Sequence, residues 1–315
     1  MKLHAVIAAI ALPMFVLSGS AQQGPPAAPA ATGLAQRIVH TEPSRFRASK
    51  SVHGGAGTLE FMALLNSNAF DTNMHFVHRG AIQPKSGIGA HFHNQCEEMF
   101  VILDGEAQFT IDGRTSVLKG PAGAPVRMGR SHAIYNHTDK PVQWLNLNVT
   151  ARKGVYDNFD LGDTREGAPL DPIPQFITMR FAQGGGPGRG GGPVTAARGT
   201  VQNRRLLDPS VFLTAWAYVD HLVLPAGAAT APQTLADIGE TFYVMSGEGK
   251  ITAGTESAVI KAGDAIPVKL AETKSFENTG AAPLELLVVG VVRDATRKFE
   301  IMAAAAPAGR GGRGN

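Results

Sequence analysis

The residues best suited to chemistry lie in one short stretch, GIGAHFHNQCEEMFVILDG, at residues 87–105. His91 and His93 are separated by one residue. Because side chains on a β-strand alternate between faces, both imidazoles are expected on the same side of one strand. Glu98 begins a second apolar strand and can bring a carboxylate oxygen to the same point. These three side chains form a candidate site for a metal ion.

A further ligand is expected much later in the chain, because a barrel closes by pairing strands that are distant in sequence. The segment RMGRSHAIYN supplies His132, which follows a turn at Gly129 and precedes Asn136. Three imidazoles and one carboxylate suit a divalent transition metal, with coordination positions left for water or substrate. Mn, Fe, Ni, Cu and Zn all fit this donor set. The sequence therefore predicts one such ion without choosing its identity.

Short strands separated by Gly, Pro and Asp must position these residues. Asp112 and Gly113 form a strong hairpin signal. No long amphipathic helix is predicted here, and the irregular segment 157–181 is expected to pack outside the barrel. This pattern favours a sandwich or barrel. The segments with strand character include LEFMALL (59–65), NMHFVHRG (73–80), AQFTIDGRTSVL (107–118) and VQWLNLNVTA (142–151).

Beyond the tract GGGPGRGGGP the first half of the chain repeats in weakened form. ETFYVMSGEGKITAG aligns with EMFVILDGEAQFTIDG, which places Glu240 at the position of Glu98. KSFENTGAAP aligns with SHAIYNHTDKP around Asn278 and Asn136. An internal repeat of this kind indicates a duplicated barrel.

The second copy lacks the three histidines. Gln233, Leu235 and Lys274 stand in their places, and only Glu240 is retained. A carboxylate inside a barrel needs a positive partner once its metal is lost, so we predict an ion pair between Glu240 and Lys274. The second domain is then expected to stabilise the protein, to form a dimer interface or to act as a lid. The alternative is a second substrate site.

The first ligand stretch resembles the first motif of the cupin superfamily, HxH followed by Glu and then Gly, ending here at Gly105. Gly129, His132 and Asn136 resemble the second motif, PxGxxHxxxN, except that Arg127 stands where the family has Pro. With the repeat, the resemblance implies an all-β chain of two tandem cupin (double-stranded β-helix, or jelly-roll) barrels joined by a Gly-rich linker, that is, a bicupin.

The family hosts several chemistries, so the fold does not settle the function. The first interpretation is an oxidoreductase resembling the quercetin-cleaving dioxygenases, with Glu98 holding the ion and able to accept a proton. The second is a metal-dependent lyase, decarboxylase or isomerase, although two-cupin oxalate decarboxylases keep metal motifs in both halves. The third is a non-catalytic cupin that binds a small ligand or sugar.

Three residues near the motifs are candidate substrate contacts. Arg127 can bind an anionic substrate or be a solvated surface residue, and Gln95 lies in the turn between the ligand strands. Phe100 suits an aromatic or apolar substrate but equally suits the barrel core. The chain has no nucleophile elbow, phosphate loop or dinucleotide fingerprint, so the ion is the candidate catalytic group.

The N-terminus, MKLHAVIAAIALPMFVLSGSAQQ, has the pattern of a signal peptide over residues 1–21. Its apolar run is shorter than the ~18 residues of a membrane span, although a membrane anchor is the alternative. The protein is therefore expected to be periplasmic or secreted. Its one cysteine, Cys96, cannot form an internal disulfide and is expected to be a small buried residue.

A net charge of +3 in 315 residues is too weak and scattered to argue for nucleic acid as a partner. The expected partner is a small-molecule substrate, with no membrane contact after signal cleavage, and a homodimer is left open. The expected divisions are a signal peptide (1–21), a disordered tether (22–48), a metal-binding cupin domain (49–183), a Gly-rich linker (184–199), a degenerate cupin domain without metal (200–303) and a disordered tail (304–315).

Overall fold

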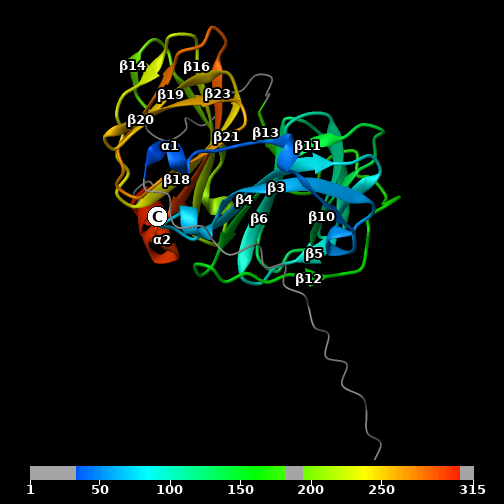
Figure 1. The fold of residues 1–315 in the computed structure, drawn as a ribbon. Coiled ribbons are helices and arrows are strands. Elements are labelled where there is room, and N and C mark those ends of the chain that lie inside the picture. Colours follow the sequence, from blue (N-terminus) through cyan, green and yellow to red (C-terminus); the bar gives the residue numbers. More distant parts are fainter. Residues whose placement is uncertain (1–32, 182–193, 306–315) are drawn as a thin grey trace, which may run out of the picture.

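The computed structural model describes residues 33–181 and 194–305. These residues form two β-barrels that lie side by side, built from four sheets (Figure 1). The paired strands within these sheets are antiparallel, as expected of jelly-roll barrels. The expected signal peptide, the glycine tract 184–193 and residues 306–315 lie outside the described residues.

The first barrel packs a seven-stranded sheet, ordered β13-β9-β6-β11-β4-β3-β2, on a five-stranded sheet, ordered β12-β5-β10-β7-β8. Its strands are β2 (Arg47–Lys50), β3 (Thr58–Asn66), β4 (Met74–Ile82), β5 (Ser86–Phe92), β6 (Cys96–Ile102), β7 (Glu106–Ile111), β8 (Arg114–Lys119), β9 (Ala122–Val126), β10 (His132–Asn136), β11 (Val142–Thr150), β12 (Phe159–Asp160) and β13 (Met179–Arg180).

The second barrel packs a six-stranded sheet, ordered β1-β21-β18-β23-β16-β15, on a five-stranded sheet, ordered β14-β17-β22-β19-β20. Its strands are β1 (Val39–His40), β14 (Ala196–Arg198), β15 (Gln202–Leu207), β16 (Trp216–Leu224), β17 (Ala229–Thr230), β18 (Ile238–Ser246), β19 (Glu248–Ala253), β20 (Glu256–Lys261), β21 (Asp264–Val268), β22 (Lys274–Asn278) and β23 (Leu284–Val292).

Helices are short and peripheral. They are α1 (Leu34–Arg37), α2 (Ala295–Ala305) and the 3-10 turns η1 (Pro43–Arg45), η2 (Val52–Gly54), η3 (Ser67–Ala69) and η4 (Pro209–Val211). In the described part of the chain, none of them has the length and apolar character that crossing a membrane requires.

The turn signals in the sequence act as predicted. β7 and β8 form a hairpin across Asp112 and Gly113, whose φ angles are 48° and 75°. Two consecutive positive φ values are typical of the type I′ turn, which matches the twist of the strands. Gly105 and its counterpart Gly247 also have positive φ, at 57° and 81°, so both barrels require glycine at this point.

The asparagines that the repeat aligned are structural in both barrels. The Asn136 side chain donates to the carbonyls of Ile82, Gln83 and Lys140. Asn278 donates in the same way to Leu224 O and Ala282 O. Because each amide ties strand ends together inside its own barrel, the asparagine persists where the metal ligands do not.

The two barrels share an apolar core between the outer faces of their larger sheets. Met99 and Leu145 of the first barrel pack in one buried cluster with Trp216, Leu287 and other residues of the second. Strand alternation explains this arrangement, because Met99 points away from the barrel interior that its neighbour Glu98 faces. The outward-facing residues of the first domain are thus buried by the second.

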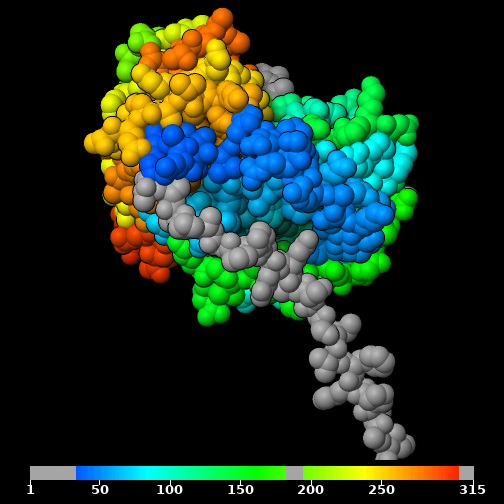
Figure 2. Space-filling view, in the orientation of Figure 1, coloured from blue at the N-terminus to red at the C-terminus, as the bar shows by residue number. Residues whose placement is uncertain are grey.

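The N-terminal segment corrects one prediction from the sequence. Residues 22–48 were interpreted as a disordered tether. Residues 22–32 lie outside the described residues, but residues 33–50 contain α1, β1, η1 and β2. β1 pairs with β21, and Leu34 is buried among residues of the second barrel. The segment that precedes the first barrel in sequence therefore packs on the second barrel. Figure 2 shows this blue segment lying across both barrels.

Two other boundaries also differ from the prediction. The Gly-rich linker was assigned to residues 184–199, but β14 lies within it and pairs with β17. The tail was predicted to begin at residue 304, and α2 continues to Ala305. Both elements lie at the edge of a domain. Packing on the barrel gives them regular structure although their amino-acid composition is typical of a linker or a tail.

Candidate metal centre

The four predicted ligands meet inside the first barrel. His91 lies near the end of β5 opposite His132 at the start of β10, and Glu98 lies on β6. His93 follows β5 directly. The four side chains are no more than 3% exposed, and their ligand atoms all lie within 4.8 Å of one another. The structure thus assembles the residues that the sequence selected, in an arrangement that can hold a metal ion.

One carboxylate oxygen is the point on which the three imidazoles converge. Glu98 Oε2 lies 2.7 Å from His132 Nε2, 3.0 Å from His93 Nε2 and 3.6 Å from His91 Nε2. Glu98 Oε1 accepts a hydrogen bond of 2.7 Å from Asn146 Nδ2 on β11. The donor atoms therefore face a common centre, and Asn146 fixes the rotation of the carboxylate.

The outer nitrogens of two histidines orient these rings. His91 Nδ1 lies 2.8 Å from the carbonyl of Gly89, and His93 Nδ1 lies 2.5 Å from the carbonyl of Asp157. A carbonyl can only accept, so these contacts place a proton on Nδ1 and leave the Nε2 lone pair directed inward. This is the arrangement that metal-binding histidines use, and the donor set fits a divalent transition metal.

The protonation states of the four ligand residues depend on one another. Burial opposes ionisation of Glu98, but His93, His132 and His91 outweigh it and hold the pKa of this carboxyl well below its usual range. Burial also opposes the charged form of His93, yet Glu98 raises the pKa of this imidazole to about 11. Burial lowers the pKa of His91 to about 4, with His132 adding to the effect. Without an ion, the carboxylate is balanced by a proton on His93.

Aromatic rings surround the centre. The His53 ring stacks on His91 with ring centroids 3.9 Å apart, and the Phe100 ring lies 5.1 Å from His132. Tyr156 lies 5.3 Å from His93, and burial raises the pKa of its hydroxyl. The ligands are therefore bordered by flat rings of His53, Phe100 and Tyr156.

The segment that closes this site was not recognised in the sequence. Asp157 accepts hydrogen bonds from the backbone N–H groups of Asn94 and Gln95, at 3.0 and 2.9 Å. Asp160 lies 2.6 Å from His53 Nδ1, and β12 pairs with the end of β5. These residues belong to the irregular stretch 157–181, which has no periodicity that could place it against a particular strand.

Arg127 is a correction. It was predicted either to bind an anionic substrate or to be a solvated surface residue, but its guanidinium donates to the carbonyls of Val211 and Ser210 in the second domain, at 2.6 and 2.8 Å. Arg127 lies just beyond the end of β9, where the chain reaches the junction between the barrels. Spacing in the motif placed this residue near the ligands but did not indicate the direction of its side chain.

The other two candidate substrate residues keep their predicted neighbourhood. Phe100 is 2% exposed and lies between His132 and Trp144, so it forms part of the barrel interior beside the ligands. Gln95 forms the turn through its backbone, accepting from the N–H of Ala151 at 2.7 Å. A substrate contact for either residue remains a prediction.

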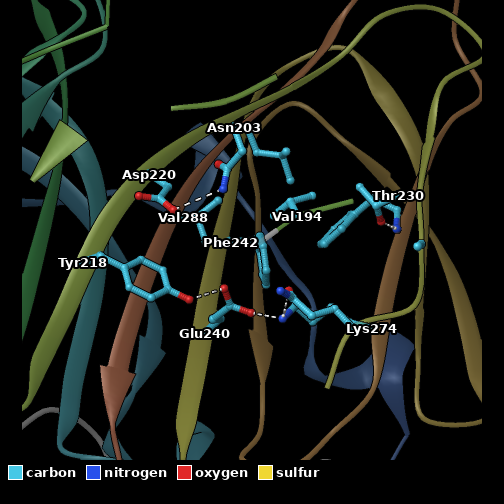
Figure 3. A pocket seen from close by; sticks show the side chains of 13 residues that line it. Val194, Asn203, Tyr218, Asp220, Thr230, Glu240, Phe242, Lys274 and Val288 are labelled. Atoms are coloured by element: carbon cyan, nitrogen blue, oxygen red, sulfur yellow. Dashed lines mark hydrogen bonds and ion pairs between the residues drawn. The ribbon is translucent and has the colours of Figure 1, made fainter. Parts of the chain in front are cut away.

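The same position in the second barrel holds an ion pair (Figure 3). Glu240 contacts the Lys274 ammonium through one oxygen and accepts a hydrogen bond of 2.7 Å from the Tyr218 hydroxyl through the other. Lys274 also donates to Gln233 Oε1 at 2.7 Å. The predicted pair is confirmed. The cavity beside it has a volume of about 20 Å³, which is room for roughly one water molecule.

Comparison with known families explains the duplication. A model described as "Cupin domain" matches the chain twice, over residues 78–148 and 220–290. The first match contains all four ligands and the second contains the ion pair. The chain is a bicupin. Its two matched segments correspond to the two barrels of the structure.

Two curated proteins are similar to part of the chain. The bicupin is 28% identical over 118 residues to an oxalate-binding protein of Thermotoga maritima, which covers 38% of this chain and 95% of that protein. It is 27% identical over 84 residues to an uncharacterised protein of Methanocaldococcus jannaschii, covering 27% of this chain and 67% of that protein.

Solved structures share the two-barrel fold. One is the oxalate decarboxylase of Lactobacillus farciminis in a formate complex, with a TM-score of 0.57 and 12% identity, covering 85% of this chain and 93% of that chain. Another is the salicylate 1,2-dioxygenase of Pseudoaminobacter salicylatoxidans with gentisate, with a TM-score of 0.57 and 14% identity, covering 77% of this chain and 75% of that chain. At these identities the likeness establishes the fold alone.

Proposed function

We propose that this bicupin is an exported, metal-dependent oxidoreductase that cleaves a small enolic or aromatic substrate with dioxygen. The observation that carries the proposal is the buried group of three histidines and one glutamate inside the first barrel, with aromatic rings packed against it. A bound divalent ion would supply Lewis acidity and, if redox-active, a route for electrons to dioxygen.

The residues of the chain favour a flat substrate of low charge. The rings of His53, Tyr156 and Phe100 border the ligands and offer apolar faces. Arg127, the cation expected near the site, is engaged at the domain junction. Burial lowers the pKa of His53, so this ring is largely neutral at pH 7 despite Asp160 beside it. A planar enol or phenol suits this lining better than a small dianion.

Glu98 carries the negative charge of the four-residue ligand group. The neighbouring imidazoles hold the pKa of this carboxyl well below its usual range, so Glu98 would accept the proton of an enolic or phenolic hydroxyl only when it loosens from the ion. Asn146 holds Oε1, and Oε2 is the atom that faces the imidazoles and would bind the ion. Glu98 is 2% exposed, so little bulk water reaches its carboxylate.

Substrate-dependent dioxygen uptake tests the proposal. Protein loaded separately with Fe, Mn, Cu, Ni or Zn is supplied with flavonols, β-diketones and dihydroxybenzoates in an oxygen electrode. We expect uptake with at least one redox-active metal, with cleaved product by mass spectrometry. Uptake should be absent with zinc and in His93→Ala. Stoichiometric metal without uptake on any of these substrates would count against the oxidative reaction.

The second candidate is a non-oxidative reaction on, or simple binding of, a small carboxylate. The observation that favours it is the 28% identity to an oxalate-binding protein. Oxalate added to the same metal-loaded samples separates the cases. Release of CO₂ without net oxygen uptake indicates a decarboxylase, and calorimetric binding without turnover indicates a binding protein.

Export is part of the proposal and rests on the sequence of residues 1–21. Expression of the full chain in a bacterium, followed by fractionation and N-terminal sequencing, tests it. We expect a periplasmic or secreted protein that begins near residue 22. An intact N-terminus in the cytoplasmic fraction would contradict export.

A further inference from the structure

A short piece of the second barrel is bound by charged side chains from both domains. The piece is residues 210–214, which begins within η4 and runs towards β16. Three side chains bind its backbone: Glu97 and Arg127 of the first domain and Lys298 of α2. We call these three residues the 210–214 clamp.

Glu97 makes the densest set of these contacts. Strand alternation on β6 directs it away from Glu98, and its side chain is fully buried. It accepts hydrogen bonds from the Leu213 N–H at 2.8 Å, from the Thr214 N–H at 2.8 Å and from the Thr214 hydroxyl at 2.7 Å. The buried Glu97 carboxylate therefore receives these hydrogen bonds from backbone and hydroxyl groups of the second domain.

The two cations of the clamp bind the carbonyls of the same segment. Arg127 donates to Ser210 O and Val211 O. Lys298 is 1% exposed and donates to Phe212 O at 2.7 Å and Thr214 O at 2.8 Å. The backbone of the segment therefore meets an anion at its N–H groups and cations at its carbonyls, so the charges fix its position relative to β6.

The clamp borders the metal ligands on two adjacent strands. Glu97 directly precedes Glu98 on β6. Glu98 in turn pairs with Val126 at the end of β9, and Arg127 comes next. The turn that follows Arg127 contacts another metal ligand: the Gly129 N–H donates to the carbonyl of His93 at 2.6 Å.

We propose that the second barrel, through the 210–214 clamp, positions Glu98 for metal binding, with Glu97 as the positioning residue. The shared apolar core already joins the barrels. The charged clamp adds fixed geometry to this junction, because buried charges are tolerated only where hydrogen bonds of good geometry satisfy them. This role concerns metal affinity, so it goes beyond the proposed reaction and holds for whichever chemistry the ion performs.

The experiment compares Glu97→Gln with Met99→Ala. Gln keeps the size of the side chain but places an amide NH₂ group against backbone N–H donors. Met99 is the matched control because it flanks Glu98 on the other side, also points outward and also packs on the second barrel. Thr214→Val and Lys298→Met change the clamp from the second domain and leave β6 unaltered.

For each full-length variant, the dissociation constant for Zn²⁺ is measured by competition with a chromophoric chelator, and the absorption spectrum of the Co²⁺ form is recorded. All samples are kept well below their melting temperature. Removing partners that orient metal ligands typically weakens affinity by about 10- to 100-fold, and we expect this for Glu97→Gln, with an altered Co²⁺ spectrum. Smaller losses are expected for Thr214→Val and Lys298→Met.

Met99→Ala should lower the melting temperature yet bind Zn²⁺ within about twofold of the wild type, since it opens a cavity without touching the clamp. The proposal is overturned if Glu97→Gln binds as tightly as the wild type, or if Met99→Ala weakens binding equally. Wild-type protein that binds no metal would overturn both this role and the metal centre. Tight binding without oxygen uptake would remove only the proposed reaction.

Discussion

The two barrels of this protein solve the same electrostatic problem in different ways. Each carries a glutamate at the same place on an inner strand, Glu98 on β6 and Glu240 on β18. In the first barrel the carboxylate faces three imidazoles, and in the second it faces the ammonium of Lys274. A buried carboxylate requires positive charge nearby, and either a metal ion or a lysine can supply it.

The strands that carry these residues pair in the same way in the two barrels. His132 lies opposite His91, and Lys274 forms a bridge with Gln233 at the corresponding position. The second barrel therefore keeps the frame of a metal site while its side chains fill the centre. The comparison separates residues that build the barrel from residues that hold an ion, and four predictions test that separation.

The largest effect is expected from His93→Ala in the first barrel. The substitution removes one ligand and leaves Glu98 with two imidazole neighbours, so the purified protein should lose its stoichiometric metal. Elemental analysis of wild type and variant after identical metal loading checks this. Gln233→Ala in the second barrel is the control and should leave the metal content unchanged. Full occupancy in His93→Ala would refute the ligand assignment.

The converse change should create a second metal site. Gln233→His, Leu235→His and Lys274→His together would surround Glu240 with three imidazoles on the frame that the first barrel uses. We expect the metal content to rise from one to two ions per chain. A content that stays at one would mean that the two frames differ more than the aligned strands indicate.

Lys274→Met should destabilise the fold, because it leaves Glu240 buried with Tyr218 as its remaining contact in Figure 3. Breaking a buried ion pair in this way typically costs about 3–5 kcal/mol. Urea denaturation measures the loss. The double variant Glu240→Gln/Lys274→Met should recover much of it, since no charge is then stranded. A single variant as stable as the wild type would show that the pair is dispensable.

The smallest effect is a pH dependence confined to the first barrel. Glu98 raises the pKa of His93 to about 11 despite burial, so the metal-free site carries a proton at neutral pH that the ion must displace. Raising the pH removes this competitor, and affinity should therefore rise about tenfold, or ~1.4 kcal/mol, per pH unit through the neutral range. Calorimetry in buffers of different ionisation enthalpy should register about one released proton; a value near zero would contradict the assignment.

Much of the centre could be predicted from spacing alone. His91 and His93 share a strand face because they are two residues apart, and Glu98 follows after one turn. The Glu240–Lys274 pair followed from the repeat and from the cost of an isolated buried charge. These inferences use the period of a strand or the need to neutralise charge, both of which are local properties of the chain.

Other features depended on contacts between segments that have no period. Arg127 was placed near the ligands correctly, but its direction is set by carbonyls more than 80 residues away in sequence. The same holds for Asp157, which closes the metal site from an irregular stretch. It also holds for β1, which joins the second barrel although the first follows it in the chain.

The sequence by itself determined the two barrels, the four ligands in the first and the ion pair in the second, because alternation and repetition are written into residue order. The tertiary structure decided which loops close the site, where the N-terminal segment docks and how Glu97 joins the domains. These features depend on contacts between a side chain and a backbone group of a distant segment. Residue spacing within one segment does not predict such contacts.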